Sequence, residues 1–266
     1  MKRRTFLHTT IATSGLAALP SLTTAAEDKP MPARQLFELR TYLLRADKQP
    51  LLDVYFSKAL IPALNRLGVK SVGAFSETPA PQTPPLPTPV AYLLIPYQSA
   101  EQMAAVTAGL WSDVAYQKAA AEYLSVPATD PVYERVESSL LSAIEGMPQL
   151  VAPPGKPTLF NLRIYESHNE AAAKKKIEMF NQGELSIFRR VGLTPVFFGE
   201  ALVGARLPNL TYLLAFPDET ARTAAWNTFR NDPEWKTLRA IPEYEDKRIV
   251  SKITNKLLTP VEYTQI

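Results

Sequence analysis

Phe37-Glu38-Leu39-Arg40-Thr41-Tyr42 recurs 123 residues later as Phe160-Asn161-Leu162-Arg163-Ile164-Tyr165. Two further matches follow in the same order: Tyr92-Leu93-Leu94 with Tyr212-Leu213-Leu214, and a stretch through Asp113 and Tyr116 with one through Asp232 and Trp235. Because the order is kept and the spacing changes little, the repeat indicates a duplicated domain rather than a solenoid unit. We therefore expect one domain over residues 34–145 and a second over residues 158–266.

Each copy reads strand, helix, strand, strand, helix, strand. In the first copy, alternation of apolar and polar residues predicts a strand over 36–44, and Pro62 should kink or split the helix that follows. The first copy has further expected strands at 70–77, 90–97 and 132–143 and helical regions at 47–67 and 99–124. The second copy has expected strands at 158–167, 194–202, 208–216 and 247–258 and helical regions at 169–191 and 218–241.

Two proline-rich stretches separate these elements. Residues 78–89 contain six prolines and predict an extended surface loop within the first copy. Residues 146–157 contain four prolines and two glycines, a composition typical of a linker between domains.

The order of elements predicts an α+β fold made of two tandem ferredoxin-like (βαββαβ) domains. Each such sheet is covered by helices on one face only. If Phe37, Leu39 and their counterparts pack under the helices, alternation places Arg40 and Arg163 on the opposite face. We expect the two copies to bury those faces against each other as a pseudo-dimer of the dimeric α/β-barrel kind, with a pocket inside the barrel.

Residues 1–26 have the features of an export signal. Arg3 and Arg4 precede Phe6-Leu7, an apolar stretch runs to Leu19, and Thr24-Ala25-Ala26 offers small residues for cleavage. This order resembles a twin-arginine signal, although an ordinary secretory signal or a retained anchor is also compatible with it. We expect a periplasmic or otherwise exported protein with no membrane contact after signal removal.

Composition excludes several classes of protein. The chain has 29 basic and 26 acidic residues, and the signal holds three of the basic ones and no acid, so the rest is formally neutral and nucleic-acid binding is not expected. Absence of cysteine excludes thiolate chemistry, and His168 alone remains after signal removal, so no metal site is expected. No cofactor motif is found, and the lysines at 174–176 should face solvent on a helix.

The repeated motif resembles the opening of NIPSNAP-family domains. Similar features are Tyr212-Leu213-Leu214-Ala215-Phe216, the run Asn231-Asp232-Pro233-Glu234-Trp235 and the ending Leu257 to Tyr263. The first copy departs from the family pattern, because Asp113-Val114-Ala115-Tyr116 replaces Asp-Pro-Glu-Trp. The resemblance implies a dimeric α/β-barrel fold without a generally established reaction.

Arg40 and Arg163 are the leading candidate ligand residues. Each could hold a carboxylate through two parallel hydrogen bonds, or could instead pair inside the protein with Glu38, Glu77 or Glu200. A buried guanidinium must have one or the other.

Tyrosines recur with the arginines. Tyr42, Tyr92, Tyr165 and Tyr212 are candidates to orient a ligand or, for Tyr42 and Tyr165, to relay a proton, although core packing is the alternative. His168 is a further candidate base, but its place at a helix entry also suits a surface residue. The three tryptophans, Trp111, Trp226 and Trp235, are expected to anchor helices on the sheets.

Three functions are compatible with these features. The first is binding of a small, partly apolar ligand in the barrel without catalysis. The second is a cofactor-independent oxygenase or isomerase, and the third is an interaction module whose sheets serve assembly, including a homo-oligomer.

Overall fold

The computed structural model describes residues 33–81 and 83–266, which form an eight-stranded closed barrel flanked by helices. The predicted signal, residues 1–26, lies outside the described residues. The strands are β1 Leu36–Leu44, β2 Gly73–Thr78, β3 Val90–Tyr97, β4 Tyr133–Ala143, β5 Leu159–Glu166, β6 Thr194–Val203, β7 Asn209–Phe216 and β8 Lys252–Pro260.

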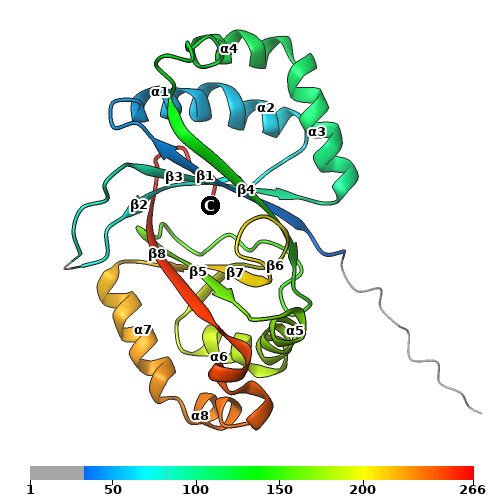
Figure 1. Cartoon of the computed structure of the whole chain (residues 1–266), viewed down its shortest axis with the longest axis vertical. Coiled ribbons are helices and arrows are strands. Elements are labelled where there is room, and N and C mark those ends of the chain that lie inside the picture. The colour runs from blue at the N-terminus through cyan, green and yellow to red at the C-terminus, as the bar shows by residue number, and fades with distance from the viewer. Residues whose placement is uncertain (1–32, 82) are drawn as a thin grey trace, which may run out of the picture. The chain divides into compact units, whose positions relative to one another are not determined.

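The two halves of the chain contribute equally to the barrel. The strands follow one another as β1-β3-β2-β8-β5-β7-β6-β4, so the first half supplies β4-β1-β3-β2 and the second half supplies β8-β5-β7-β6. Both sets have the same internal order, and all the pairings are antiparallel. This order is that of a ferredoxin-like sheet and confirms the predicted fold class (Figure 1).

Two seams close the barrel between the halves. β2 pairs with β8 from Phe75 opposite Pro260 to Thr78 opposite Leu257, and β4 pairs with β6 from Leu140 opposite Val203 to Ala143 opposite Gly199. Backbone hydrogen bonds therefore cross both seams, and the barrel leaves no sheet edge open. The described residues all belong to one compact unit, so the division into two domains at the proline-rich linker stays a prediction.

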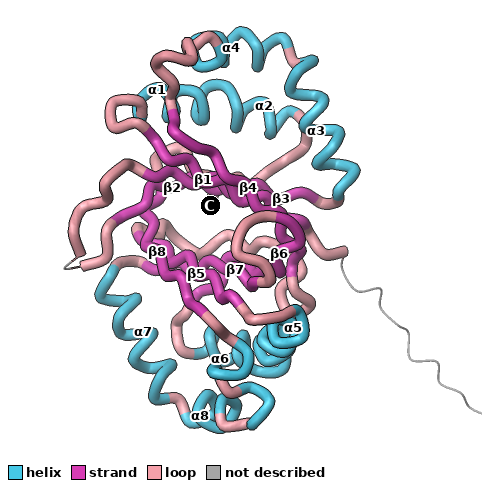
Figure 2. Tube along the Cα trace, viewed as in Figure 1, coloured by secondary structure: helices cyan, strands magenta, loops and turns pink. Residues whose placement is uncertain are grey.

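The helices form two layers with the barrel between them (Figure 2). The first-half helical segments are α1 Gln49–Val54, η1 Tyr55–Leu60, α2 Ile61–Arg66, α3 Ala100–Ser112 and α4 Val114–Leu124. The second-half segments are α5 Glu170–Met179, η2 Phe180–Glu184, α6 Leu185–Arg190, α7 Glu219–Asn231, α8 Pro233–Arg239, η3 Pro242–Tyr244 and α9 Asp246–Ile249. No helix among these residues is long and apolar enough to cross a membrane.

Asp113 and Asp232 begin equivalent helices. The Asp113 side chain accepts a hydrogen bond from the Tyr116 backbone N–H at the start of α4, and Asp232 accepts one from Trp235 at the start of α8. Each aspartate also forms a salt bridge with an arginine at the end of the first helical region of its half. Asp113 lies 2.6 Å from Arg66 of α2, and Asp232 lies 2.7 Å from Arg190 of α6. These shared contacts make Asp113 and Asp232 reference positions for comparing the halves.

A π-helical turn divides the first helical region of each half. It is η1 in the first half and η2 in the second. Pro62 lies at the start of α2, where the sequence predicted a split. Ser186 occupies the corresponding place in α6, so the π turn does not depend on proline. Gly68 and Gly192 end the two regions with φ of 88° and 85°, values that favour glycine.

The predicted assignment of strand faces is wrong. Phe37, Leu39 and Phe160 fill the inside of the barrel, where their cluster also holds Phe75 and Phe197. The opposite faces of β1 and β5, which carry Arg40, Tyr42, Arg163 and Tyr165, are covered by helices. Both faces of β1 and β5 are covered, one by the barrel interior and one by helices, so apolar alternation alone does not distinguish the interior from the helix side.

Candidate functional site

Two cavities are candidates for a binding site. One of about 540 Å³ lies inside the barrel, and one of about 290 Å³ lies between the second-half sheet and its helices. The barrel cavity is where the sequence predicted a pocket. The other is called here the helix-side pocket.

Charges in the barrel cavity are balanced. Its wall holds two basic residues, Arg206 and Lys256, and two acidic residues, Glu77 and Glu137. The Lys256 Nζ lies 2.6 Å from one oxygen of the buried Glu77 carboxylate, and the Tyr92 hydroxyl donates to the other oxygen at 2.7 Å. Burial and the hydrogen bond to Glu77 raise the pKa of Tyr92 above its ordinary value. Lys256, Glu77 and Tyr92 therefore satisfy one another without a ligand.

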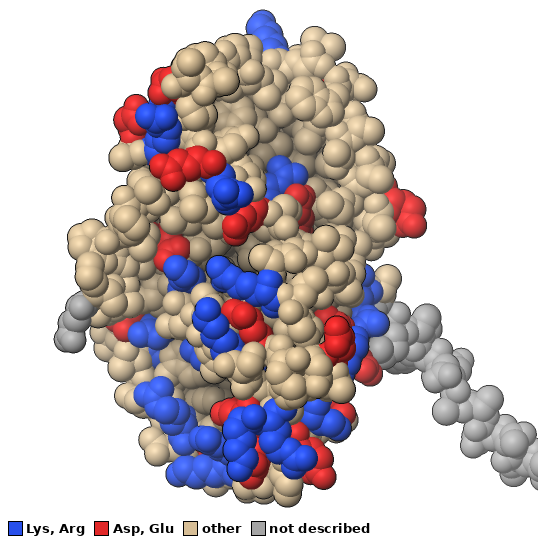
Figure 3. Space-filling model, viewed as in Figure 1, with Lys and Arg blue, Asp and Glu red and all other residues tan. Residues whose placement is uncertain are grey.

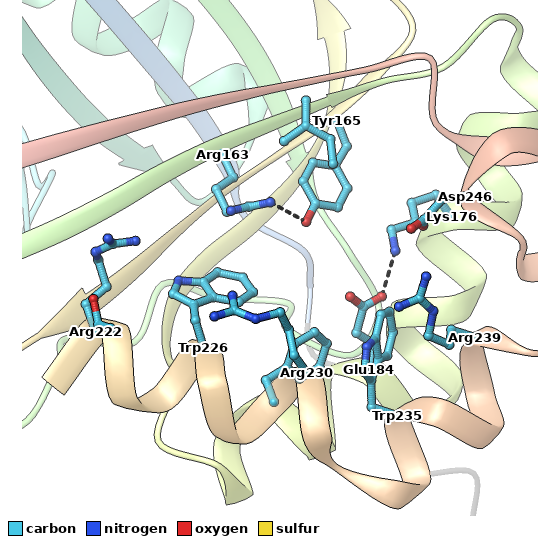
Figure 4. Close-up of a pocket in the computed structure, with 13 residues that line it drawn as sticks. Arg163, Tyr165, Lys176, Glu184, Arg222, Trp226, Arg230, Trp235, Arg239 and Asp246 are labelled. Atoms are coloured by element: carbon cyan, nitrogen blue, oxygen red, sulfur yellow. Dashed lines mark hydrogen bonds and ion pairs between the residues drawn. The ribbon is translucent and has the colours of Figure 1, made fainter. Parts of the chain in front are cut away.

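Charges in the helix-side pocket are unbalanced. Five basic residues line it against two acidic ones, which are Glu184 and Asp246. The basic side chains come from β5, α5, α7 and α8 (Figure 4), and they are Arg163, Lys176, Arg222, Arg230 and Arg239. Aromatic side chains of the sheet and helices share the wall, and they are Tyr165, Trp226, Phe229 and Trp235.

Arg163 lies at the strand side of this pocket and forms no ion pair with an acidic residue of the described ranges. Its register on β5 places it between Tyr212 of β7 and Asn255 of β8. Its Nη2 donates to the Tyr165 hydroxyl at 3.0 Å, and its Nη1 donates to the Asn255 side-chain oxygen at 3.3 Å. Its buried Nε has no hydrogen-bond partner among the described residues. The guanidinium carbon stacks 4.6 Å from the ring of Trp226.

Arg40, the equivalent residue of the first half, is neutralised inside the protein. Its Nε and Nη2 donate to the two oxygens of Glu38 at 2.7 and 3.0 Å. Burial alone would raise the pKa of Glu38, but the hydrogen bond and charge of Arg40 hold that pKa below its ordinary value. Ser138 and Tyr97 also donate to the same carboxylate. The predicted internal pairing is thus confirmed for Arg40 with Glu38.

The second half lacks this pairing because Asn161 stands where the first half has Glu38. Asn161 is fully buried, donates to the Asn255 side chain at 2.7 Å and accepts from the Trp226 indole at 3.3 Å. A neutral amide cannot compensate the charge of Arg163. The predicted acidic partners Glu77 and Glu200 bind lysines instead, Lys256 and Lys174.

The candidate tyrosines fall in different environments. Tyr165 lines the helix-side pocket, and its hydroxyl accepts a hydrogen bond from the fully buried Tyr212 at 2.9 Å. Tyr42 packs in the first-half core against Phe56 and Tyr133. These three side chains lie on the helix side, and Tyr92 alone among the candidate tyrosines faces the barrel interior.

Tyr92 and Tyr212 are therefore not equivalent, as the sequence comparison had paired them. Arg40 lies opposite Leu93 and Arg163 lies opposite Tyr212, so the counterpart of Tyr212 is Leu93. The alignment was wrong by one residue at this strand, and a shift of one residue moves each side chain to the other face.

Three arginines of α7 and α8 are specific to the second half. Counting from the equivalent caps Asp113 and Asp232, the first half has Met103, Trp111 and Ala120 where the second has Arg222, Arg230 and Arg239. Arg222 pairs with Glu219 at 2.6 Å, and Arg239 stacks 5.7 Å from the ring of Trp235. Figure 3 shows Lys and Arg gathered over the second-half helices, whereas the surface over the first-half helices is mostly uncharged.

Lys176 and Glu184 were not predicted as site residues. Both side chains are only 2% exposed, and Nζ of Lys176 lies 2.8 Å from Oε2 of Glu184. The expectation that the lysines at 174–176 face solvent holds for Lys174, which is 67% exposed, and is wrong for Lys176. Complete burial raises the pKa of Glu184, and the charge of Lys176 offsets part of that rise.

The remaining candidates lie away from both cavities. His168 is exposed at the turn before α5 and lines neither cavity, which fits a surface residue. Trp226 and Trp235 are buried as predicted, whereas Trp111 is 63% exposed, so its expected core role is wrong. Within the described ranges, no three His, Asp or Glu side chains are grouped as they would be around a metal ion.

The half of the chain that carries this pocket matches a known protein family. The NIPSNAP family model matches residues 160–265. The second half contains a NIPSNAP domain. The match runs from β5 to the residues after β8, so all the lining residues of the helix-side pocket belong to the NIPSNAP domain. A search among curated proteins found no match to the chain.

Two solved structures share the fold over most of the chain, and a third resembles a part of it. A candidate monooxygenase from Fusobacterium nucleatum is 10% identical with a TM-score of 0.60, covering 87% of this chain and 94% of its own. A second, from Lactobacillus acidophilus, is 10% identical with a TM-score of 0.56, covering 85% and 94%. A NIPSNAP-like protein from Burkholderia xenovorans is 18% identical with a TM-score of 0.36, covering 41% and 89%. At 10% identity the likeness to the first two structures concerns the fold alone.

Proposed function

We propose that the chain binds a small anionic molecule with an aromatic or apolar body in the helix-side pocket of its NIPSNAP domain. The observation that carries this proposal is Arg163, a partly buried guanidinium whose hydrogen bonds to other described residues go to neutral groups, while its counterpart Arg40 is neutralised by Glu38. A buried charge without a partner is costly, and an anionic ligand removes that cost.

The walls of the pocket suit the rest of such a molecule. Trp226 and Tyr165 present rings beside Arg163, and Trp235 lines the end of the pocket near Lys176. The pocket of about 290 Å³ accommodates a single substituted ring. Arg222 is compensated by Glu219, whereas Arg230 and Arg239 add positive charge at the helix side, which favours entry of an anion. A carboxylate fits the fork of a guanidinium through two hydrogen bonds.

The barrel cavity is larger but supports this function less. Its buried carboxylate, that of Glu77, already forms a salt bridge with Lys256 and accepts a hydrogen bond from Tyr92. Cations and carboxylates are equal in number along its wall, so it offers no net attraction for an anion. The proposal thus differs from the sequence expectation in the place of the ligand.

Calorimetric titration tests the proposed ligand class. We expect the protein to bind phenylacetate and phenylpyruvate but neither phenylacetamide nor phenethylamine, since only the first two carry an anion. Arg163→Met should weaken carboxylate binding by about 2 kcal/mol or more, which is roughly 30-fold or more in the dissociation constant.

A matched variant distinguishes the two cavities. Arg206→Met removes one positive charge from the barrel cavity and should leave carboxylate affinity unchanged. If Arg206→Met weakens binding and Arg163→Met does not, the ligand occupies the barrel and the proposed site is wrong.

We also propose that the protein is exported as a folded precursor by way of its N-terminal residues. The support is the placement of Arg3 and Arg4 before Phe6-Leu7 and the small residues at 24–26. Substituting both arginines by lysine should leave the precursor in the cytoplasm, as measured by cell fractionation and immunoblotting. Export at the wild-type level would contradict the twin-arginine assignment.

A further inference from the structure

The buried pair of Lys176 and Glu184 lies at one end of the helix-side pocket. Lys176 comes from α5, and Glu184 is the last residue of the π turn η2. The Lys176 Nζ lies 4.8 to 5.8 Å from the centres of three aromatic rings, those of Phe180, Tyr165 and Trp235. Figure 4 shows Glu184 between Lys176 and Trp235, with Arg163 extending from the strands above. Both members of the pair contribute to the pocket wall.

The fold itself does not require these charges. Counting back from the equivalent glycines Gly68 and Gly192, the first half has Leu52 and Leu60 where the second has Lys176 and Glu184. Both leucines are fully buried, and the first half has the same π turn. A buried ion pair is often no more stable than apolar residues of similar size, so packing alone does not account for this pair.

The chemistry of the pair suits proton transfer. Removal of a carboxylate from water favours its protonated form, so Glu184 can accept a proton more readily than a surface glutamate. Lys176 holds Oε2 at 2.8 Å and keeps a positive charge beside any negative charge that develops in the pocket. Arg163, on the neighbouring strand β5, supplies an anchor for a carboxylate.

We propose that Glu184 transfers protons on the bound ligand and that the pocket catalyses the keto–enol isomerisation of aromatic 2-oxo acids. This inference rests on the proposed function, because the substrate carboxylate is held by Arg163. The substrate ring lies against Trp226 and Tyr165, and the carbon next to the carbonyl faces Glu184.

The reaction conserves atoms and electrons without a further reactant. The Glu184 carboxylate takes a proton from the methylene carbon, and the electron pair of that C–H bond forms the carbon–carbon double bond. The carbonyl π electrons move to oxygen and give an enolate. As Glu184 is then neutral, the Lys176 ammonium compensates the enolate charge. Glu184 returns the proton to the enolate oxygen, which yields the enol and restores the carboxylate.

Phenylpyruvate in deuterated, weakly buffered solution tests this reaction. We expect the wild-type protein to accelerate deuterium incorporation at the methylene carbon, followed by proton NMR, above the rate without protein. Glu184→Gln should lower this acceleration by about 100-fold or more while the dissociation constant of phenylpyruvate stays unchanged. Arg163→Met should instead weaken binding.

A second variant covers the risk that Glu184→Gln unfolds with Lys176 left unpaired. The double substitution Lys176→Leu/Glu184→Leu reproduces the leucine pair of the first half and should also abolish the acceleration. Phenylpyruvate that binds without accelerated exchange, or unchanged exchange in either folded variant, overturns the inference and leaves the binding proposal intact. Failure of every aromatic carboxylate to bind overturns both.

Discussion

The substitution Lys176→Leu should lower the free energy of unfolding by about 3–5 kcal/mol, because it leaves the Glu184 carboxylate buried without its partner. Both side chains are 2% exposed, so water cannot replace the lost charge. Urea denaturation followed by circular dichroism measures the change. A loss below about 1 kcal/mol would indicate that Glu184 is not buried as described.

The double substitution Lys176→Leu/Glu184→Leu is the matched control for this prediction. Since Leu52 and Leu60 are fully packed at the equivalent places, the second half should accept the same pair. We expect the double variant to recover to within about 1 kcal/mol of the wild type or to exceed it. If the double variant is as unstable as the single one, the two halves do not pack equivalently at this point.

Arg40→Met should also destabilise the fold, by about 3 kcal/mol. The substitution removes the bidentate salt bridge to the Glu38 carboxylate, and the hydroxyls of Ser138 and Tyr97 cannot supply a positive charge in its place. The expected value is at the lower end of the range for buried pairs, because the Arg40 side chain remains 22% exposed. The midpoint of urea denaturation gives the measurement.

The equivalent substitution in the second half provides the contrast. The hydrogen-bond partners of Arg163 are the neutral side chains of Tyr165 and Asn255, so its removal leaves no carboxylate buried without a partner. Arg163→Met should therefore change the free energy of unfolding much less than Arg40→Met, and should weaken ligand binding instead. Equal losses of stability from the two substitutions would contradict the distinction between a structural arginine and a ligand-binding arginine.

The fold could be predicted because the repeat and the order of elements determine it. The hexapeptides 37–42 and 160–165 do occupy equivalent strands, β1 and β5, and the proline-rich loop and linker fall between elements as expected. The family resemblance is confirmed for residues 160–265. In the first half, Asp113 keeps its capping role although the residues after it differ from the family pattern.

The faces of the strands could not be predicted from alternation. The strands that carry the repeated motif, β1 and β5, are covered on both faces, one by other strands and one by helices, and β7 is buried at all eight positions. The same property hid the register error at Tyr92 and Tyr212, because a run of apolar residues can be shifted by one place without exposing any of them.

The charged pair in the pocket could have been found from the sequence. Lys176 sits among other lysines on a helix, a pattern typical of a solvated face, and nothing in that stretch alone marks it as buried. Comparison of the two copies from their terminal glycines places Lys176 and Glu184 opposite Leu52 and Leu60. Eight residues separate the members of each pair, about two helical turns, so both lie on one face toward the core. The lack of an acid at position 161 is visible in the same comparison.

The two seams between the halves have a consequence for how this site can exist. In a barrel assembled from two identical subunits, any substitution appears twice, so an arginine that lacks its acid would be present in both copies. Here β2 with β8 and β4 with β6 join unequal halves of one chain. The first half can keep the stabilising ion pair of Arg40 with Glu38, while the second half lacks such a pair and leaves Arg163 able to bind a ligand. The expected stoichiometry is therefore one ligand per chain, with a hyperbolic and non-cooperative isotherm.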